Sequence, residues 1–324
     1  MKRQFFAFGA GAMGIVLVSF AQPARPPAIL EYPAPEIREE QQVVVDGHAE
    51  TWRLQWAAPP KPVCEASDLA LALTCPCMGF AYGESGALAL IRLRGGVEID
   101  RLDLAQFFVG ESSAGNQVAV LQRRAPDYNE DLDAAGNPGF LSKASKRPVV
   151  QVMHFADYEH DGAHSEFYLQ TDAIPCGKSV GLVIGVSPKN PRLHAVGSAS
   201  EPGKPLHLQA REWDALRDAS APIEVLDWAC ADHGSETETT LRLHWSAAGI
   251  DGTIREYTCP AAGEPKRLLH EESLGAGRLA KLVGQSIQAA RSSATLPSVD
   301  FPGDKKLVTQ FPFLSSAYSF HLPS

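Results

Sequence analysis

Short runs in which apolar and polar residues alternate recur through most of the chain. Such alternation is typical of β-strands with one buried and one exposed face. The clearest case is 87–104, where Ile91 and Leu93 alternate with arginines and Gly95-Gly96 separates two alternating runs. We expect a hairpin there, whose arginines and acids pair across the strands on the solvent-exposed face.

Helical periodicity is confined to two stretches. A short helix is expected at Arg211–Arg217, and the apolar residues of Arg278–Arg291 recur three and four positions apart, which is typical of an amphipathic helix. We therefore expect a mainly-β fold with many short antiparallel strands, a sandwich or a propeller-like arrangement, and one C-terminal amphipathic helix.

The N-terminus has the pattern of a secretory signal peptide. A basic start precedes the apolar run Phe5–Phe20. Small residues stand at Ser19 and Ala21, the two positions that determine cleavage. An uncleaved anchor is the alternative, but a membrane-spanning helix needs about 20 apolar residues. We expect cleavage after Ala21 and export to the periplasm or the cell exterior.

These patterns divide the chain into five segments. We assign a signal peptide to 1–21, a Pro-rich leader to 22–40, a mainly-β region of one or two domains to 41–272, a helix to 273–295 and an extended Pro- and aromatic-rich tail to 296–324.

Charge narrows the class of partner. Cleavage would lower the total of Lys and Arg from 29 to 27 against 38 Asp and Glu, which gives a net charge of −11. No long basic run remains, so nucleic acid and anionic membrane surfaces are poor partners. No second apolar stretch approaches spanning length, so we expect no membrane span after cleavage.

Six cysteines lie in the exported part, where disulfides form and persist. Cys230 and Cys259 are a plausible local pair, and Cys64 with Cys75 or Cys77 is another, although spacing alone does not fix the connectivity. A redox or metal site at Cys75-Pro76-Cys77 is the alternative, but common redox and zinc sites use Cys-x-x-Cys spacing.

One loop between two strand-like runs carries specific chemistry. Acidic residues stand at alternate positions, Gly162 follows the third of them, and two further oxygen-bearing residues come soon after. Ca²⁺ takes roughly six to eight oxygen ligands, which a curled loop supplies from alternate positions, and glycine permits the sharp turn. The predicted ligands are the side chains of Asp157, Glu159, Asp161, Ser165 and Glu166 and the carbonyl of Ala163.

This strand–loop–strand stretch resembles the calcium loops of FG-GAP and VCBS-type repeats, which occur in β-propeller and related extracellular folds. The resemblance covers about ten residues of one copy. The chain departs from the pattern with Glu159 at the third position and Ser165 at the ninth, and Glu166 stands at the tenth. An acidic turn without an ion is the alternative, and the nearby His160 and His164 leave another metal open.

Three functions are open at this stage. The leading one is a calcium-stabilised binding or structural module of the cell envelope or exterior, with an unknown protein or glycan ligand and no catalytic activity. The second is a secreted hydrolase that uses acidic and His residues near the 154–166 loop as general acid and base. The third is an envelope protein without a metal site. An enzyme would bring acids from several segments into one cleft, whereas an ion-clamped module gathers them at one loop.

Overall fold

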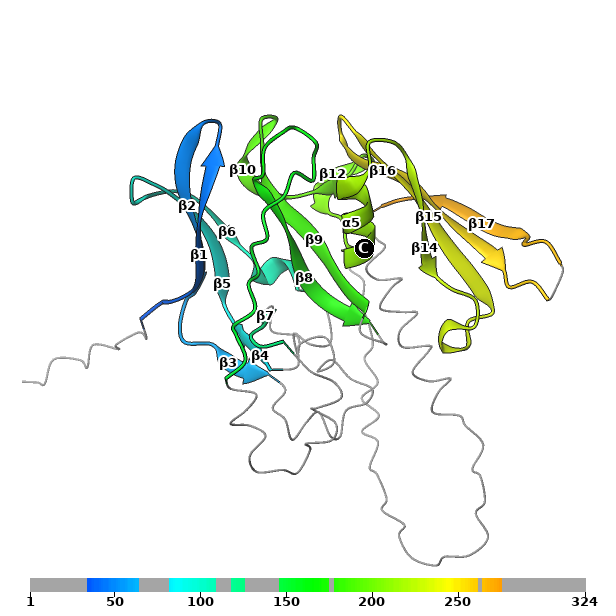
Figure 1. Cartoon of the computed structure of the whole chain (residues 1–324), viewed down its shortest axis with the longest axis horizontal. Coiled ribbons are helices and arrows are strands. Elements are labelled where there is room, and N and C mark those ends of the chain that lie inside the picture. Colours follow the sequence, from blue (N-terminus) through cyan, green and yellow to red (C-terminus); the bar gives the residue numbers. More distant parts are fainter. Residues whose placement is uncertain are drawn as a thin grey trace, which may run out of the picture. The chain divides into compact units, whose positions relative to one another are not determined.

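A computed structural model describes residues 34–63, 82–108, 118–125, 146–174, 178–261 and 264–275 (Figure 1). Strands predominate in these ranges, and the expected mainly-β class with antiparallel sheets is confirmed. Chain contacts separate Met1–Pro33 from Ala34–Ser324, and the fold below is that of the second unit. The residues assigned to a signal peptide, most of those assigned to the leader and those of the tail lie outside the described residues.

The first sheet has the antiparallel order β1-β2-β5-β6. Its strands are β1 (Glu36–Val45), β2 (His48–Trp56), β5 (Leu88–Arg94) and β6 (Val97–Asp103). The expected hairpin is confirmed, because β5 and β6 pair around Gly95-Gly96, whose φ angles are 58° and 81°. β1 begins at Glu36, so residues 36–40 belong to this sheet and not to an irregular leader.

The second sheet has the order β10-β9-β13, and β8 also pairs with β9. Its strands are β8 (Glu166–Ile174), β9 (Lys178–Ser187), β10 (Asn190–Ala195) and β13 (Leu208–Gln209). Leu182, Ile184 and Val186 of β9 join the core of the first sheet, whereas Val183 joins a second core. Because successive residues of a strand point to opposite faces, β9 is covered on both sides.

The second core joins β9 to a third sheet through α5 (Ala210–Asp218), which confirms the short helix expected at Arg211–Arg217. Trp213 and Leu216 of α5 pack with Leu241 and Leu243 in this core. The third sheet consists of β11 (Gly197–Ser198), β12 (Glu201–Pro205), β14 (Ile223–Trp228), β15 (Thr237–Ser246), β16 (Gly249–Thr258) and β17 (Leu268–Ser273).

Three short strands and two 3-10 helices complete the described structure. They are β3 (Lys61–Val63), β4 (Gly83–Gly86) and β7 (Ala119–Gln122), which form one sheet, and η1 (Ala105–Phe107) and η4 (Asp232–Gly234).

Most of the expected C-terminal helix at 273–295 lies outside the described residues, so only its first three positions are tested. Ser273 ends β17, and Leu274 and Gly275 are not helical, so the first three positions of that assignment are wrong. Arg278–Arg291 lies outside the described residues. Within the described ranges, no helix has the length and apolar character needed to cross a membrane.

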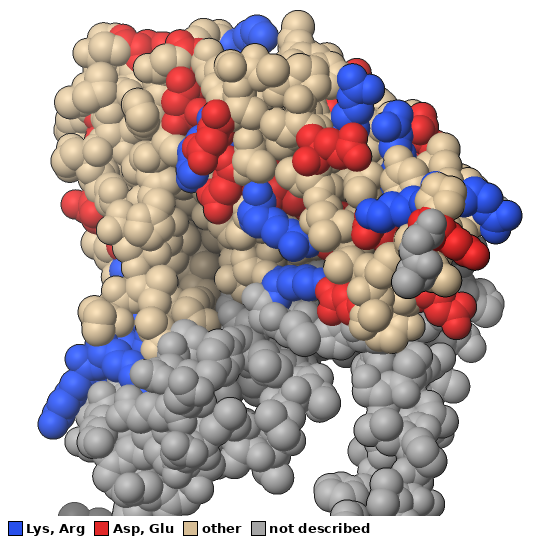
Figure 2. All heavy atoms as spheres, turned by 45° about the vertical axis from the view of Figure 1, so that its right-hand side comes forward, with Lys and Arg blue, Asp and Glu red and all other residues tan. Residues whose placement is uncertain are grey.

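The expected disulfide between Cys230 and Cys259 is present. It joins the chain just after β14 to the chain just after β16, at one end of the third sheet. The other four cysteines lie outside the described residues. On the face shown in Figure 2, acidic and basic side chains are intermingled rather than separated into patches of one sign.

Candidate binding groove

The acidic loop is held in shape by one carboxylate. Asp157 accepts hydrogen bonds from the backbone N–H groups of Asp161 (3.0 Å) and Gly162 (2.9 Å). Asp161 in turn accepts one from the N–H of Ala163 at 2.8 Å. Gly162 has a φ of 86°, the left-handed conformation that favours glycine. The loop therefore forms the sharp turn that the sequence indicates.

The two ligands predicted after the turn lie on the buried side of the loop. The Glu166 carboxyl accepts bonds from the backbone N–H of Tyr158 and the hydroxyl of Ser165, both at 2.9 Å. The Ser165 hydroxyl also lies 2.9 Å from the carbonyl of Val186. Burial raises the pKa of Glu166 to about 8, against the lowering effect of these hydrogen bonds. At neutral pH this carboxyl is therefore mostly protonated and neutral.

Glu159, the remaining predicted side-chain ligand, and the nearby His160 contact other parts of the fold. Glu159 lies 3.7 Å from Nε2 of His194 on β10. Burial opposes protonation of His194, but Glu159 and the Arg192 carbonyl together outweigh burial and raise the pKa of the imidazole. The ring of His160 lies 3.0 Å from the carbonyl of Leu216 on α5.

The six predicted ligands are thus distributed over three places and do not converge. Asp157, Asp161 and Ala163 share the exposed turn, Ser165 and Glu166 contact each other in the interior, and Glu159 lies beside β10. Within the described ranges, no group of three or more His, Cys, Asp or Glu side chains has the geometry to hold a metal ion.

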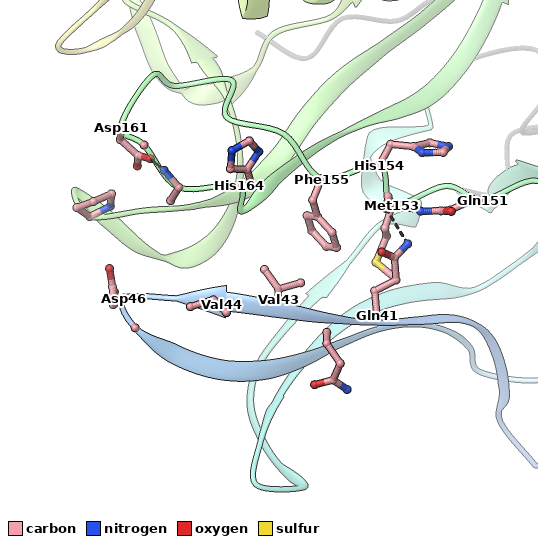
Figure 3. A pocket seen from close by; sticks show the side chains of 15 residues that line it. Gln41, Val43, Val44, Asp46, Gln151, Met153, His154, Phe155, Asp161 and His164 are labelled. Carbon is pink, nitrogen blue, oxygen red and sulfur yellow. Dashed lines mark hydrogen bonds between the residues drawn. The ribbon is translucent and has the colours of Figure 1, made fainter.

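The exposed turn nevertheless forms part of a larger feature, a groove of about 890 Å³. We call it the β1 groove. One wall is β1 with its turn, lined by Gln41–Val44, Asp46 and Gly47, and the other is formed by Gln151, Met153–Phe155 and Asp161–His164 (Figure 3). Pro188 also lines the groove. Because four consecutive residues of β1 line it, and alternate residues face opposite sides of a strand, the groove follows the strand's edge.

Side chains of β1 form hydrogen bonds with the second wall at one end of the groove. Glu39 accepts hydrogen bonds from the backbone N–H groups of Val152 (2.7 Å) and Met153 (3.1 Å). The amide of Gln41 donates to the Met153 carbonyl at 2.7 Å. Beyond Met153, the described residues of the second wall form no further hydrogen bond with β1. The walls therefore separate beside the second half of β1.

The lining is apolar along part of its length and acidic at one end. Val43 and Phe155 point toward each other from the two walls, and the Phe155 ring packs edge to face on Trp52, with the ring centroids 5.2 Å apart (Figure 3). Asp46 and Asp161 lie at the hairpin end, on opposite walls (Figure 3). No Lys or Arg is among the described residues that line the groove.

The second half of β1 lies in the predicted mainly-β region, but the first half and the groove itself were not found from the sequence. The run from Glu36 to Gln42 is polar and has no alternation, so it gave no strand signal. The available signal was Asp46-Gly47, because this dipeptide marks a two-residue hairpin and so requires a strand before it.

Comparison with known proteins gives no assignment. No family model matches the chain, and neither the curated proteins nor the solved structures contain a match. A functional assignment therefore rests on the residues of the groove and its loop wall.

Proposed function

We propose that this chain is an exported binding module whose ligand lies in the β1 groove. The observation that carries the proposal is the course of this groove along a strand edge, with a lining that is apolar along part of its length and acidic at one end. Ligand sites are typically concave and mostly apolar, with a few polar groups that fix orientation. Export is supported by the leader pattern of 1–21 and by the Cys230–Cys259 disulfide, since such bonds persist in oxidising compartments.

The proposal is tested by filling the groove. Ala163 is half-buried in the loop wall, so Ala163→Trp should occlude the groove, whereas Ala247→Trp changes an exposed residue at the β15–β16 turn. Both variants and the wild-type protein are screened against a displayed peptide library and a glycan array, after circular dichroism has shown that each variant is folded. Binders should survive Ala247→Trp and disappear with Ala163→Trp. A set of binders insensitive to Ala163→Trp would contradict the proposal.

Calcium binding by the loop wall stays a prediction of the sequence. In its favour, the carboxylates of Asp157 and Asp161 lie on one exposed turn next to the Ala163 carbonyl. The full set of six ligands is disfavoured, because Glu166 is buried, mostly protonated and bonded to Ser165. A calcium ion here would contact Asp157, Asp161, the Ala163 carbonyl and water, and it would stabilise the turn rather than supply chemistry.

Thermal unfolding in excess Ca²⁺ and in excess EGTA measures this effect. A site specific to the native state adds about 2.7 kcal/mol when Ca²⁺ is a hundredfold above its dissociation constant. Asp161→Asn should reduce the stabilisation, because it removes one negative charge from the site, and it is a mild change because the amide oxygen can still accept the bond from Ala163. An equal midpoint in Ca²⁺ and EGTA would mean that the loop is an acidic turn held by its own hydrogen bonds without an ion.

A further inference from the structure

The edge of β1 presents unpaired backbone groups to the groove. Val45 and His48 flank the two-residue turn, and both turn residues have positive φ, 49° and 74°, so these flanking residues form a hydrogen-bonded pair. Bonded and non-bonded pairs alternate along an antiparallel ladder. The N–H and C=O groups of Gln42 and Val44 therefore point away from β2.

No described residue pairs with these outward groups. β1 is the last strand of its sheet, and neither Gln42 nor Val44 takes part in a backbone hydrogen bond on the groove side within the described ranges. Unpaired N–H and C=O groups on an edge strand are a template for another strand. Val44 is also 64% exposed, so this part of the edge is accessible.

Among the described residues, the opposite wall does not pair with β1 through backbone hydrogen bonds. Strands that pair directly lie about 4.8 Å apart. Here the Glu39 side chain, not a backbone group, bridges β1 to the N–H groups of Val152 and Met153. A whole side chain therefore separates the two backbones at Glu39, and the last such bridge joins Gln41 to Met153 at one end of the groove.

The residues that line the groove also favour particular side chains on an added strand. Successive side chains of an added strand point to opposite faces, so every second one would meet Val43 and Phe155, and the others would lie beside exposed Val44. At the hairpin end, Asp46 and Asp161 face the groove, and no Lys or Arg is among the described residues that line it (Figure 3). A Lys or Arg side chain is the natural complement to two carboxylates.

From these contacts we propose that the β1 groove binds an extended peptide segment of a partner protein. The peptide adds a strand to the edge of β1 through Gln42 and Val44, places an apolar side chain against Phe155, and sets a Lys or Arg between Asp46 and Asp161. The inference rests on the proposed function, because it names the ligand class of the same groove.

The experiment uses the full mature chain and a displayed library of nine-residue peptides. The tightest peptide is resynthesised in three forms: unmodified, N-methylated at the backbone positions that face β1, and N-methylated at the alternate positions. Methylation at the facing positions should weaken binding at least about tenfold, because it removes donors to the strand edge. Methylation at the alternate positions should change the dissociation constant by less than about twofold.

Charge is tested with Asp46→Asn, a matched substitution because Asn also tolerates the left-handed conformation of this turn. The variant should bind the peptide that carries Lys or Arg about fivefold more weakly than the wild-type protein at low salt. The same peptide with Gln at that position should bind both proteins equally. Val44→Pro, which removes an outward N–H, should abolish binding while the hairpin with β2 persists.

The outcomes separate the two proposals. Groove-dependent binding of a glycan but of no peptide would overturn strand addition and leave the binding module standing. Equal effects of both methylation patterns would likewise overturn strand addition, because a peptide bound through side chains alone has no such periodicity. Failure to obtain any binder that is lost with Ala163→Trp would overturn both.

Discussion

At the scale of single residues, the fold depends on charges buried between two sheets. The Glu50 carboxylate is fully buried and accepts hydrogen bonds from Arg92 (2.8 and 2.9 Å), Arg94 (2.6 Å) and the indole of Trp52 (3.1 Å). Arg92 also donates to the carbonyl of Pro191 at 2.6 Å, which ties the first sheet to β10. Removal of Glu50 would leave Arg92 buried with only the more distant carboxylate of Asp100, at 3.7 Å, to compensate its charge.

Glu50→Gln should therefore destabilise the protein by about 3 kcal/mol, measured by urea unfolding at pH 7. Burial alone would raise the pKa of Glu50, but the bonds from Arg92, Arg94 and Trp52 outweigh it and lower the pKa below its ordinary value of 4.5. A lowered pKa stabilises the fold above pH 4.5, and this contribution is lost as the pH falls through the native pKa. Glu50→Gln should therefore reduce the fall in unfolding free energy as the pH is lowered.

The matched control is Glu40→Gln, on the same hairpin. Glu40 pairs with Arg53 at 2.7 Å, but both side chains are partly exposed to solvent, with 40% and 28% of their surfaces accessible. Exposed pairs contribute less than about 1 kcal/mol. Equal losses in the two variants would contradict the role given to the buried network.

His207 gives a second pH dependence. Its side chain is buried, Nε2 lies 3.4 Å from the Phe107 carbonyl, and Nδ1 has no partner among the described residues. Burial lowers the pKa of His207 below 6.5, so its contribution to stability is present above pH 6.5 and is lost as the pH falls through the native pKa. His207→Leu should reduce the fall in unfolding free energy between about pH 6.5 and 5. An unchanged pH profile in that range would contradict this assignment.

Residue environments were only partly predictable. Alternation correctly placed Ile91 in the core, but the expectation that Arg92 pairs with acids on the solvent-exposed face was wrong, since Arg92 is 4% exposed and lies against β10. Glu166 was predicted as an ion ligand, yet it is buried because the second sheet is covered on both faces. A period of two distinguishes the faces of a strand but does not say whether both are covered.

At the scale of elements, the pairing of β8 with β9 requires glycine. A Cβ atom on Gly181 would stand 2.1 Å from the carbonyl oxygen of Leu169, and one on Gly185 would stand 2.4 Å from that of Ser165. Both oxygens belong to backbone, which moves only if the strands separate. The two glycines therefore permit the close approach that buries this strand pair.

Gly185→Ala should destabilise the protein by about 2 kcal/mol or more, through overpacking against Ser165 and Glu166. Gly203→Ala is the control, because a Cβ there meets nothing within 4 Å and the residue has an ordinary φ. Urea unfolding of the two variants measures the difference. A Gly185→Ala variant as stable as Gly203→Ala would show that the strands can separate without cost.

Elements with strong local signals were predicted well. The β5–β6 hairpin follows from Gly95-Gly96 between alternating runs, and α5 follows from its helical period. The first half of β1 was missed because its polar sequence has no alternation and its place in the sheet is fixed by the side chains of Arg38 and Glu39, which bond to Val150, Val152 and Met153. Such long-range contacts leave no periodic trace in the sequence.

At the scale of the whole molecule, the described sheets share two cores, and β9 contributes to both. Composition and alternation sufficed for the mainly-β class, but not for the order of the sheets or the position of the β1 groove. The groove exists only because β1 and the segment after Val149, more than a hundred residues apart in sequence, meet at one edge. The acidic loop was the part of this site visible in the sequence, because its ligand-like spacing is local.

The Cys230–Cys259 disulfide provides a test at this scale, because it closes a loop across the third sheet, away from the residues that line the groove. Its sequence separation is 29 residues, and chain entropy for a loop of that length corresponds to about 3.5 kcal/mol. The double variant Cys230→Ala/Cys259→Ala should lose about that amount in urea unfolding. Cys230→Ala alone should lose as much, since either change breaks the same bond. Peptide affinity should be unchanged in folded protein, and a parallel loss of affinity would mean that the groove depends on the third sheet.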